Sequence, residues 1–243
     1  KNGTIDLSSV EITEDEIKNF EQIYIVACGS AYHTGVTAKY VFEKLARISI
    51  EVDLASEFRY RDPILPENTL VVIVSQSGET ADTLAALRLA KEKGVRTLGI
   101  VNVVGSSIAR EADNVMYTWA GPEIAVATTK AYSTQLIAQY LLAMKFAKVR
   151  GTVSQNDFDA MIQSLERLPE QISLLLSHKE NVQRFANRYL AAEHVFFIGR
   201  GIDYAISMEG SLKLKEISYI HSEAYASGEL KHGTISLIED GTL

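Results

Sequence analysis

The stretch LVVIVSQSGET, residues 70–80, joins an apolar run to a turn rich in hydroxyl groups. Residues 70–74 are wholly apolar, as expected for a strand buried on both faces of a parallel sheet. Residues 80–93, rich in Ala, Leu and Lys, predict a helix directly after the turn. A strand, a turn and a helix in this order form the unit from which parallel α/β sheets are built.

The same alternation extends through the first half of the chain. Further strands are predicted at 23–27, 48–54, 97–101 and 115–119, and further helices at 32–47 and 128–148. We therefore expect a five-stranded parallel sheet over 23–119 with helices on both faces. Residues 154–190 have a helical pattern with a predicted break at Pro169, and we interpret them as a connector.

A second unit is predicted to begin with a strand at 195–198, followed by Gly199-Arg200-Gly201 and a helix over 204–217. The first unit has the same order, and Ser56-Glu57 and Ser222-Glu223 suggest a faint repeat with a spacing of 222 − 56 = 166 residues. One more strand is predicted at 235–238. The expected domains are a first subdomain over 1–150, a helical connector over 151–190 and the truncated start of a second subdomain over 191–243.

Composition argues against several classes of protein. The 243 residues carry a net charge of -7, so nothing indicates a basic surface for nucleic acid or anionic lipid. No apolar run approaches the roughly 20 residues that span a bilayer, and residues 1–10 lack the core of a signal peptide. Cys28 is the only cysteine, which suits the cytoplasm and precludes an intrachain disulfide. Histidine and cysteine spacing predicts no metal site, and we expect no cofactor.

The hydroxyl-rich turn is the strongest candidate for a ligand site. It lies where a parallel strand ends and a helix begins, which is where α/β sheets bind ligands and where free N–H groups attract anions. Ser75, Ser77 and Thr80 can donate hydrogen bonds to phosphate, and the absence of a Walker pattern argues against a nucleoside triphosphate. The alternative is a plain helix cap with Ser77 as N-cap.

Three other groups of residues have both a chemical and a structural interpretation. Cys28-Gly29-Ser30 should end at the same sheet edge, but it also fits a plain strand-to-helix turn, with Cys28 structural rather than nucleophilic. One face of the predicted helix carries Glu209, Lys213 and Glu216. These three side chains could act as an acid/base group, or they could form ion pairs on a solvated surface. His232 could move protons near neutral pH or could be an exposed loop histidine.

Five blocks of sequence together resemble one known family. They lie at 55–61, 75–83, 213–221, 223–225 and 228–233, and similarity extends in order over nearly the whole chain. They closely resemble the sugar isomerase (SIS) domain of the glutamine:fructose-6-phosphate amidotransferases, or glucosamine-6-phosphate synthases. The resemblance implies an α/β fold of two SIS subdomains, each a flavodoxin-like three-layer αβα sandwich with a parallel sheet, the second incomplete in this chain. It also implies that the family's glutaminase domain and C-terminal tail lie outside this chain.

The resemblance further implies a reaction and a set of roles. The substrate would be fructose 6-phosphate, converted with ammonia to glucosamine 6-phosphate in amino sugar biosynthesis, by a homodimer with composite active sites. Glu216 would move the proton between C1 and C2 with support from Lys213 and Glu209, and His232 would open the sugar ring from the neighbouring subunit. The family often has a second hydroxyl where this chain has Ala31, so one phosphate contact would be a backbone N–H. The residues expected to line the substrate site are Cys28, Gly29, Ser30, Ser75, Gln76, Ser77, Thr80, Val126 and Thr128.

Two alternatives remain open. Another SIS-domain phosphosugar isomerase or deglycase would share the hydroxyl-rich turn, although the block Lys231-His232-Gly233 argues against it. A sugar-phosphate sensor would need the turn but not the base at Glu216, and a DNA-binding sensor would also need a basic helix-turn-helix that the sequence lacks. Replacing Glu216 by Gln would separate a sensor from an enzyme.

Overall fold

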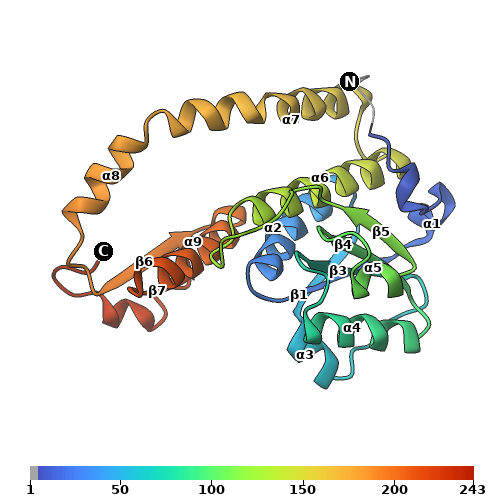
Figure 1. The fold of residues 1–243 in the computed structure, drawn as a ribbon, viewed down its shortest axis with the longest axis horizontal. Coiled ribbons are helices and arrows are strands. Elements are labelled where there is room, and N and C mark those ends of the chain that lie inside the picture. The colour runs from blue at the N-terminus through green and yellow to red at the C-terminus, as the bar shows by residue number, and fades with distance from the viewer. Residues whose placement is uncertain (1–4) are drawn as a thin grey trace. The chain divides into compact units, whose positions relative to one another are not determined.

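The computed structural model describes residues 5–243 (Figure 1), which form two compact units. The first unit covers residues 5–153 and the second covers residues 154–243. The first four residues of the predicted first subdomain lie outside the described residues. The predicted subdomain boundaries stay a prediction.

The first unit contains the five-stranded parallel sheet that the sequence predicts. Its strands are β1 (Gln22–Ala27), β2 (Ser49–Leu54), β3 (Thr69–Ser75), β4 (Arg96–Val101) and β5 (Asn114–Tyr117). All neighbours pair in parallel in the order β2-β1-β3-β4-β5, which confirms the prediction. Every residue of the central strand β3 is buried, which explains its unbroken apolar sequence.

Helices cover both faces of this sheet (Figure 1). One layer contains α1 (Glu14–Asn19), α2 (Gly29–Leu45) and α6 (Lys130–Val149), and the other contains α3 (Ala55–Tyr60), α4 (Ala81–Glu92) and α5 (Ser107–Glu111). Side chains alternate along each strand, so that Ile25 packs in the core under α2 and α6, and Val26 in the core under α3 and α4. A short 3-10 helix, η1 (Ser8–Val10), precedes α1. The predicted three-layer αβα sandwich is therefore confirmed for this unit.

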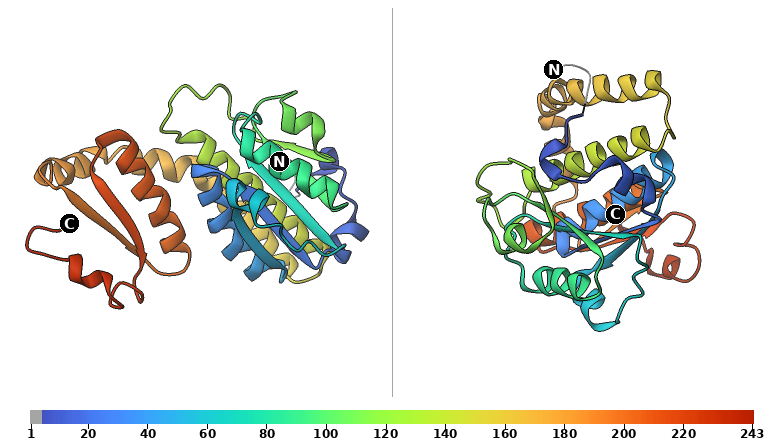
Figure 2. Two further views of the ribbon diagram at one scale, coloured as in Figure 1. Left: turned by 90° about the horizontal axis from the view of Figure 1, so that it is seen from below. Right: turned by 90° about the vertical axis from the view of Figure 1, so that its right-hand side faces the viewer.

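The second unit begins with two helices and continues into a small parallel sheet. Its elements are α7 (Gln155–Leu176), α8 (Lys179–Arg188), β6 (His194–Gly199), α9 (Ile202–Ser218), β7 (His221–Ala226) and the 3-10 helix η2 (Thr234–Leu237). Strands β6 and β7 lie side by side and pair in parallel, with α9 returning beside them (Figure 2). The unit therefore repeats the order strand, helix, strand with which the first sheet begins.

Two sequence predictions in the second unit are wrong. Pro169 lies inside α7 rather than at a break, and the helix continues to Leu176. Proline removes one backbone N–H and bends a helix, but the neighbouring turns can hold it together. Residues 235–238 are mostly apolar, like a short strand, yet they lie in and directly after η2, which follows Gly233 at a φ of 122°.

The faint repeat is real, but its spacing differs from the prediction. Gln22 pairs with Ser49 in the first sheet and His194 with His221 in the second, so paired residues are 27 positions apart in both (49 − 22 and 221 − 194). Matching the two registers gives an offset of 194 − 22 = 172 residues. The Ser-Glu pairs that suggested 166 are not equivalent, because Ser56 lies in helix α3 and Ser222 lies in strand β7.

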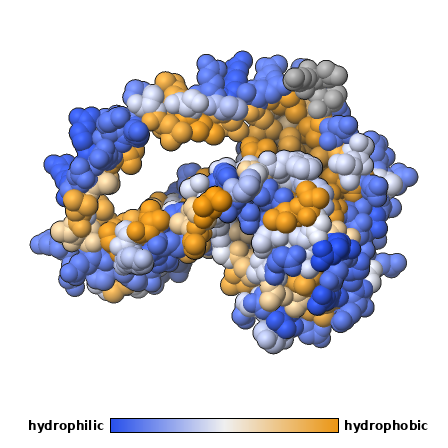
Figure 3. Space-filling model, viewed as in Figure 1, coloured by the Kyte–Doolittle hydropathy of each residue, from blue (hydrophilic) through white to orange (hydrophobic). Residues whose placement is uncertain are grey.

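Helices α7 and α8 carry much of the exposed apolar surface of the second unit. Figure 3 shows hydrophobic surface along α7, and the exposed large side chains of the two helices are Ile172, Leu174, Leu175, Leu176, Val182 and Phe185. The only buried hydrophobic residues described after residue 153 are Phe158 and Ala205. Across residues 5–243 no helix is both long and apolar enough to cross a membrane.

Candidate functional site

Two predicted site segments begin next to each other at the carboxyl edge of the first sheet. Ala27 and Val74 are register partners on β1 and β3, so Cys28 and Ser75 follow at neighbouring strand ends. The Sγ atom of Cys28 lies 3.7 Å from Oγ1 of Thr83, in the first turn of α4. The sheet order reverses between these two strands, and ligands bind at such switch points in open α/β sheets.

Residues 75–80, which we name the hydroxyl loop, are folded by their own side chains. Ser75 Oγ accepts a hydrogen bond from Gly78 N at 3.0 Å and lies 3.2 Å from Thr80 Oγ1. Ser77 Oγ accepts from Glu79 N at 3.2 Å. Gly78 has a φ of +67°, and a Cβ there would lie 2.0 Å from Ser106 Oγ, so only glycine fits. The loop is thus a defined structure rather than a flexible turn.

The helices that start at this edge have no side-chain caps. Helix α4 begins at Ala81 with Thr80 as N-cap, so the alternative that made Ser77 the N-cap is wrong. Neither Thr80 nor Cys28, the N-cap of α2, makes a side-chain capping bond. The first-turn N–H groups of both helices are therefore left for water or a ligand, and the positive end of each helix dipole favours an anion.

Two acidic side chains, one in the hydroxyl loop and one just after it, have other partners. Asp82 Oδ1 lies 2.8 Å from Arg59 Nη1 in an ion pair. Glu79 Oε1 accepts from Ser107 N at 2.7 Å, and hydrogen bonds from the hydroxyl and N–H of Ser107 hold the pKa of Glu79 below its usual value. An anion at the helix ends would meet hydroxyl and N–H groups, while the nearby carboxylates are occupied elsewhere.

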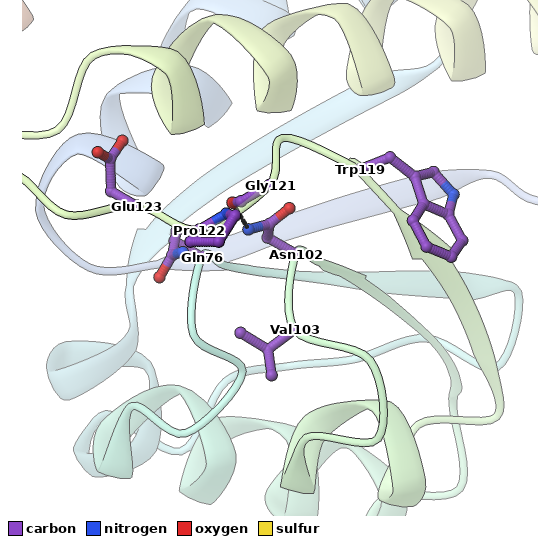
Figure 4. A pocket seen from close by; sticks show the side chains of 7 residues that line it. All are labelled: Gln76, Asn102, Val103, Trp119, Gly121, Pro122 and Glu123. Carbon is purple, nitrogen blue, oxygen red and sulfur yellow. Dashed lines mark hydrogen bonds between the residues drawn. The ribbon is translucent and has the colours of Figure 1, made fainter.

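A cavity of about 560 Å³ lies beside this loop, at the carboxyl ends of β3, β4 and β5 (Figure 4). It is lined by Gln76, Asn102, Val103, Trp119, Gly121, Pro122 and Glu123. Sequence reasoning predicted only Gln76 among these residues. Asn102 could have been found by the same rule as Ser75, because it is a polar residue directly after an apolar parallel strand.

The predicted sugar-lining residues lie in residues 118–129, which we name the β5–α6 loop. Thr128 Oγ1 donates to Glu123 Oε2 at 2.7 Å, and Thr128 N donates to Val126 O at 2.9 Å. The hydrogen bond from the Thr128 hydroxyl lowers the pKa of Glu123. The Val126 side chain is exposed. Glu123 lines the cavity, so the hydrogen bonds of this loop link Thr128 and Val126 to a residue at the edge of the cavity.

Three predicted catalytic residues contact one another on α9, as their spacing predicted. Lys213 Nζ lies 3.5 Å from Glu209 Oε1 and also donates a hydrogen bond to Glu216. The Glu209 side chain is almost completely buried, and a buried carboxylate is costly unless a cation compensates it. The ammonium group thus joins a buried and a more exposed carboxylate into one charged cluster.

Glu216 and His232 lie at opposite ends of the second βαβ segment. Glu216 is in the last turn of α9, just before β7 begins at His221. His232 is exposed in the turn after β7 ends at Ala226, and its N–H donates to Glu229 O at 2.9 Å. A six-residue strand spans about 20 Å, so the two ends of β7, which Glu216 precedes and His232 follows, are about that far apart. Residues 5–243 contain no cluster of three or more potential metal ligands.

Comparisons with known proteins place this geometry in a family. The model of the SIS domain matches residues 16–145 and 189–243. A glutamine–fructose-6-phosphate aminotransferase (isomerizing) of Caldanaerobacter subterraneus subsp. tengcongensis is 60% identical over 98% of this chain, and the one of Clostridium acetobutylicum is 59% identical over 98%. The chain spans only 39% of the length of these two relatives.

Solved structures agree with this match. The C-terminal domain of glucosamine-fructose-6-phosphate aminotransferase from Francisella tularensis aligns with a TM-score of 0.95 at 41% identity, covering 100% of this chain and 68% of that one. Glucosamine-6-phosphate deaminase from Thermotoga maritima aligns with a TM-score of 0.74 at 27% identity, covering 94% of this chain and 70% of that one.

Proposed function

This chain belongs to the SIS-domain family, and on that premise we propose that it is the sugar-phosphate isomerase portion of a glutamine–fructose-6-phosphate aminotransferase. The proposed substrate is fructose 6-phosphate, which the whole enzyme converts with ammonia to glucosamine 6-phosphate. The proposed enzyme is cytoplasmic, needs no cofactor, and includes a glutaminase domain in its full-length form. The pair of uncapped helix ends beside the hydroxyl loop is the observation that carries this proposal.

The phosphate would bind against the hydroxyl loop and the start of α2. Ser30, in the first turn of α2, and Ser77 and Thr80 supply hydroxyl donors at neighbouring strand ends. The N–H groups of two helix ends add a positive electrostatic potential without a lysine or arginine. Anchoring the phosphate in this way allows its binding energy to position the reacting carbons of the sugar.

The isomerisation requires a base that takes a proton from one carbon and returns it to its neighbour. We assign this role to Glu216, because a single carboxylate can perform both transfers. Lys213 contacts Glu216 and therefore orients it, while Glu209 compensates the charge of Lys213 from the buried side. His232 would open the sugar ring. These assignments follow from the family resemblance and agree with the contacts on α9.

We further propose that the enzyme is a homodimer with shared sites. Glu216 precedes β7 and His232 follows it, which supports a site in which the two residues come from different chains. A symmetric dimer offers a direct solution, since each chain can contribute its histidine to the site of the other.

Calorimetry with fructose 6-phosphate tests the phosphate assignment. The replacement Ser77→Ala removes one hydroxyl donor and should weaken binding roughly tenfold, which corresponds to one charge-assisted hydrogen bond. The matched control is Ser49→Ala, at the exposed amino end of β2 on the opposite edge of the sheet. Equal affinity for the wild type and Ser77→Ala would show that the phosphate binds elsewhere.

Other phosphosugar chemistry is the second candidate. It is favoured by the structural likeness to glucosamine-6-phosphate deaminase of Thermotoga maritima. The full-length enzyme should form glucosamine 6-phosphate from glutamine and fructose 6-phosphate, whereas an isomerase or deglycase would act on a phosphosugar without glutamine. A sensor would bind the sugar phosphate without turnover.

A further inference from the structure

Asn102 connects the two loops that form the candidate site. It follows β4 directly, and its backbone N–H donates to the carbonyl of Gln76 in the hydroxyl loop at 3.1 Å. Its side chain makes three hydrogen bonds to the start of the β5–α6 loop, of which Figure 4 shows the one to Gly121. One residue therefore contacts both sides of the cavity in Figure 4.

The three side-chain bonds use both ends of the amide. Oδ1 accepts from Thr118 Oγ1 at 3.1 Å and from Ala120 N at 2.8 Å, while Nδ2 donates to Gly121 O at 2.8 Å. An amide has both acceptor and donor atoms, whereas a carboxylate only accepts and a hydroxyl has a single donor. Asparagine thus fits this position better than its closest replacements.

The segment that Asn102 holds does not adopt an ordinary backbone conformation. Trp119 has a φ of +52°, which a non-glycine residue keeps only when its surroundings fix it, and Gly121 follows at +71°. The Trp119 side chain is exposed, so core packing does not fix this turn. The Asn102 side chain contributes three hydrogen bonds to the turn, beside the bond from Thr118 N to Val101 O at 3.0 Å and the contact between the rings of Trp119 and Tyr117.

The turn at 118–121 leads directly into the part of the loop that carries Glu123, Val126 and Thr128. Those residues are tied together by the bond between Thr128 and Glu123, at 2.7 Å. Movement of the turn would therefore move the predicted sugar-lining residues as a group. The hydroxyl loop would stay in place, because Ser75 and Gly78 hold it from within.

We propose that Asn102 is a positioning residue that sets the distance between the phosphate-binding hydroxyl loop and the sugar-lining β5–α6 loop. This inference rests on the proposed function for the roles of the two loops. It makes Asn102 responsible for recognition of the sugar part of a hexose phosphate, and not for recognition of the phosphate group. The two contributions to binding are thus separable by mutation.

The test compares two ligands, fructose 6-phosphate and inorganic phosphate, by calorimetry on the 243-residue chain. We expect Asn102→Ala to weaken fructose 6-phosphate binding roughly tenfold and to leave phosphate binding within about twofold, while Ser77→Ala weakens both. Asn102→Asp keeps the two acceptor contacts and loses the donor to Gly121, so its loss should be intermediate. The matched control is Asn68→Ala, an exposed asparagine just before β3 at the opposite edge of the sheet.

A second measurement does not depend on the ligand. Trp119 is the only tryptophan in the sequence, so its fluorescence anisotropy reports on the clamped turn alone. Anisotropy should fall in Asn102→Ala and stay unchanged in Asn68→Ala. Equal loss of both ligands, or no loss of either, would overturn the positioning role. If the wild type binds neither ligand, the proposed function fails, and unchanged anisotropy in Asn102→Ala would then overturn the clamp as well.

Discussion

Residues 22–60 and residues 194–232 are two copies of one βαβ arrangement in different surroundings. Both have six-residue strands, the same pairing register and a glycine in the left-handed region at the strand-to-helix turn, Gly29 at +55° and Gly201 at +58°. Five of the six residues of β1 are buried, but only Gly199 is buried in β6. Local sequence therefore determines the βαβ segment, while burial depends on the strands and helices added around it.

The contact between helix and strand differs between the copies. Ile25 and Phe197 are equivalent at the offset of 172 residues. In the first copy Gly35 allows α2 to approach Ile25, since a Cβ there would lie 2.8 Å from its Cγ2 atom. In the second copy Gly210 performs this role against the ring of Phe197, at 3.0 Å. Gly210 lies about one turn further along its helix than Gly35 does, and it faces the larger side chain, Phe197 instead of Ile25. The two copies therefore keep the same fold with different packing between helix and strand.

The largest expected effect concerns the catalytic base, which we propose only in the second copy. In the full-length enzyme, Glu216→Gln should lower kcat by about a thousandfold or more, because it removes the proposed base, and substrate binding should persist. Lys44 is its equivalent in the first copy, exposed at the end of α2, and Lys44→Gln should leave kcat unchanged. Steady-state kinetics of both variants measure this, and a Glu216→Gln enzyme with near wild-type kcat would rule out the base.

Stability should differ at the matched core positions. Ile25 is fully buried, so Ile25→Ala should cost about 3 kcal/mol. Phe197 is only partly buried, so Phe197→Ala should cost about 1–2 kcal/mol although the ring is larger. Amide hydrogen exchange measures the free energy of unfolding of each unit, so it gives the loss caused by each replacement separately. A greater loss for Phe197 than for Ile25 would contradict the difference in burial.

The two glycines with positive φ should both resist replacement. A Cβ at Gly29 or Gly201 meets no atom within 4 Å, so alanine introduces only backbone strain, about 1 kcal/mol at Gly29 and more at Gly201, whose ψ of -126° lies outside the left-handed helical region. Gly228→Ala is the control, since that position is equally open and has no positive φ. Hydrogen exchange again resolves the two units. Strain at one glycine without the other would show that the two turns are not equivalent.

The smallest effect is a pH dependence confined to the first unit. Burial opposes the ionisation of Asp113, but hydrogen bonds from Lys91 and Thr97 outweigh it and hold the Asp113 pKa below its ordinary value. A carboxyl group with a lowered pKa stabilises the fold above its unfolded pKa, and this contribution disappears as the pH falls through the folded pKa.

The Tm of the first unit should therefore fall between pH 6 and pH 3 by a few degrees more in the wild type than in Asp113→Asn. Asp15→Asn is the control, because Asp15 is almost fully exposed and its ion pair with Lys18 is long, at 3.9 Å. If Tm depended on pH identically in the wild type and in Asp113→Asn, Asp113 would not be the source of the pH dependence.

The sequence predicted the first unit well because its signals are local. The apolar run of β3 and the polar residues directly after it predicted the central strand and the hydroxyl loop. Strand β7 was missed as a strand, because the sequence HSEAYA contains no β-branched residue and the backbone pairing with β6 provides its stability. The place of Asn102 directly after β4 could have marked it as a candidate, but its hydrogen bonds to residues 16 to 19 positions away are not revealed by periodicity.

Subunit complementation tests the account most directly, because the proposed shared site takes Glu216 from one chain and His232 from the other. Inactive full-length Glu216→Gln and His232→Gln enzymes are mixed in equal amounts under conditions of proven subunit exchange. About half of the dimers are then mixed, and each mixed dimer has one intact site, so about a quarter of the wild-type activity should return. A mixture that stays as inactive as either variant alone would contradict the shared site.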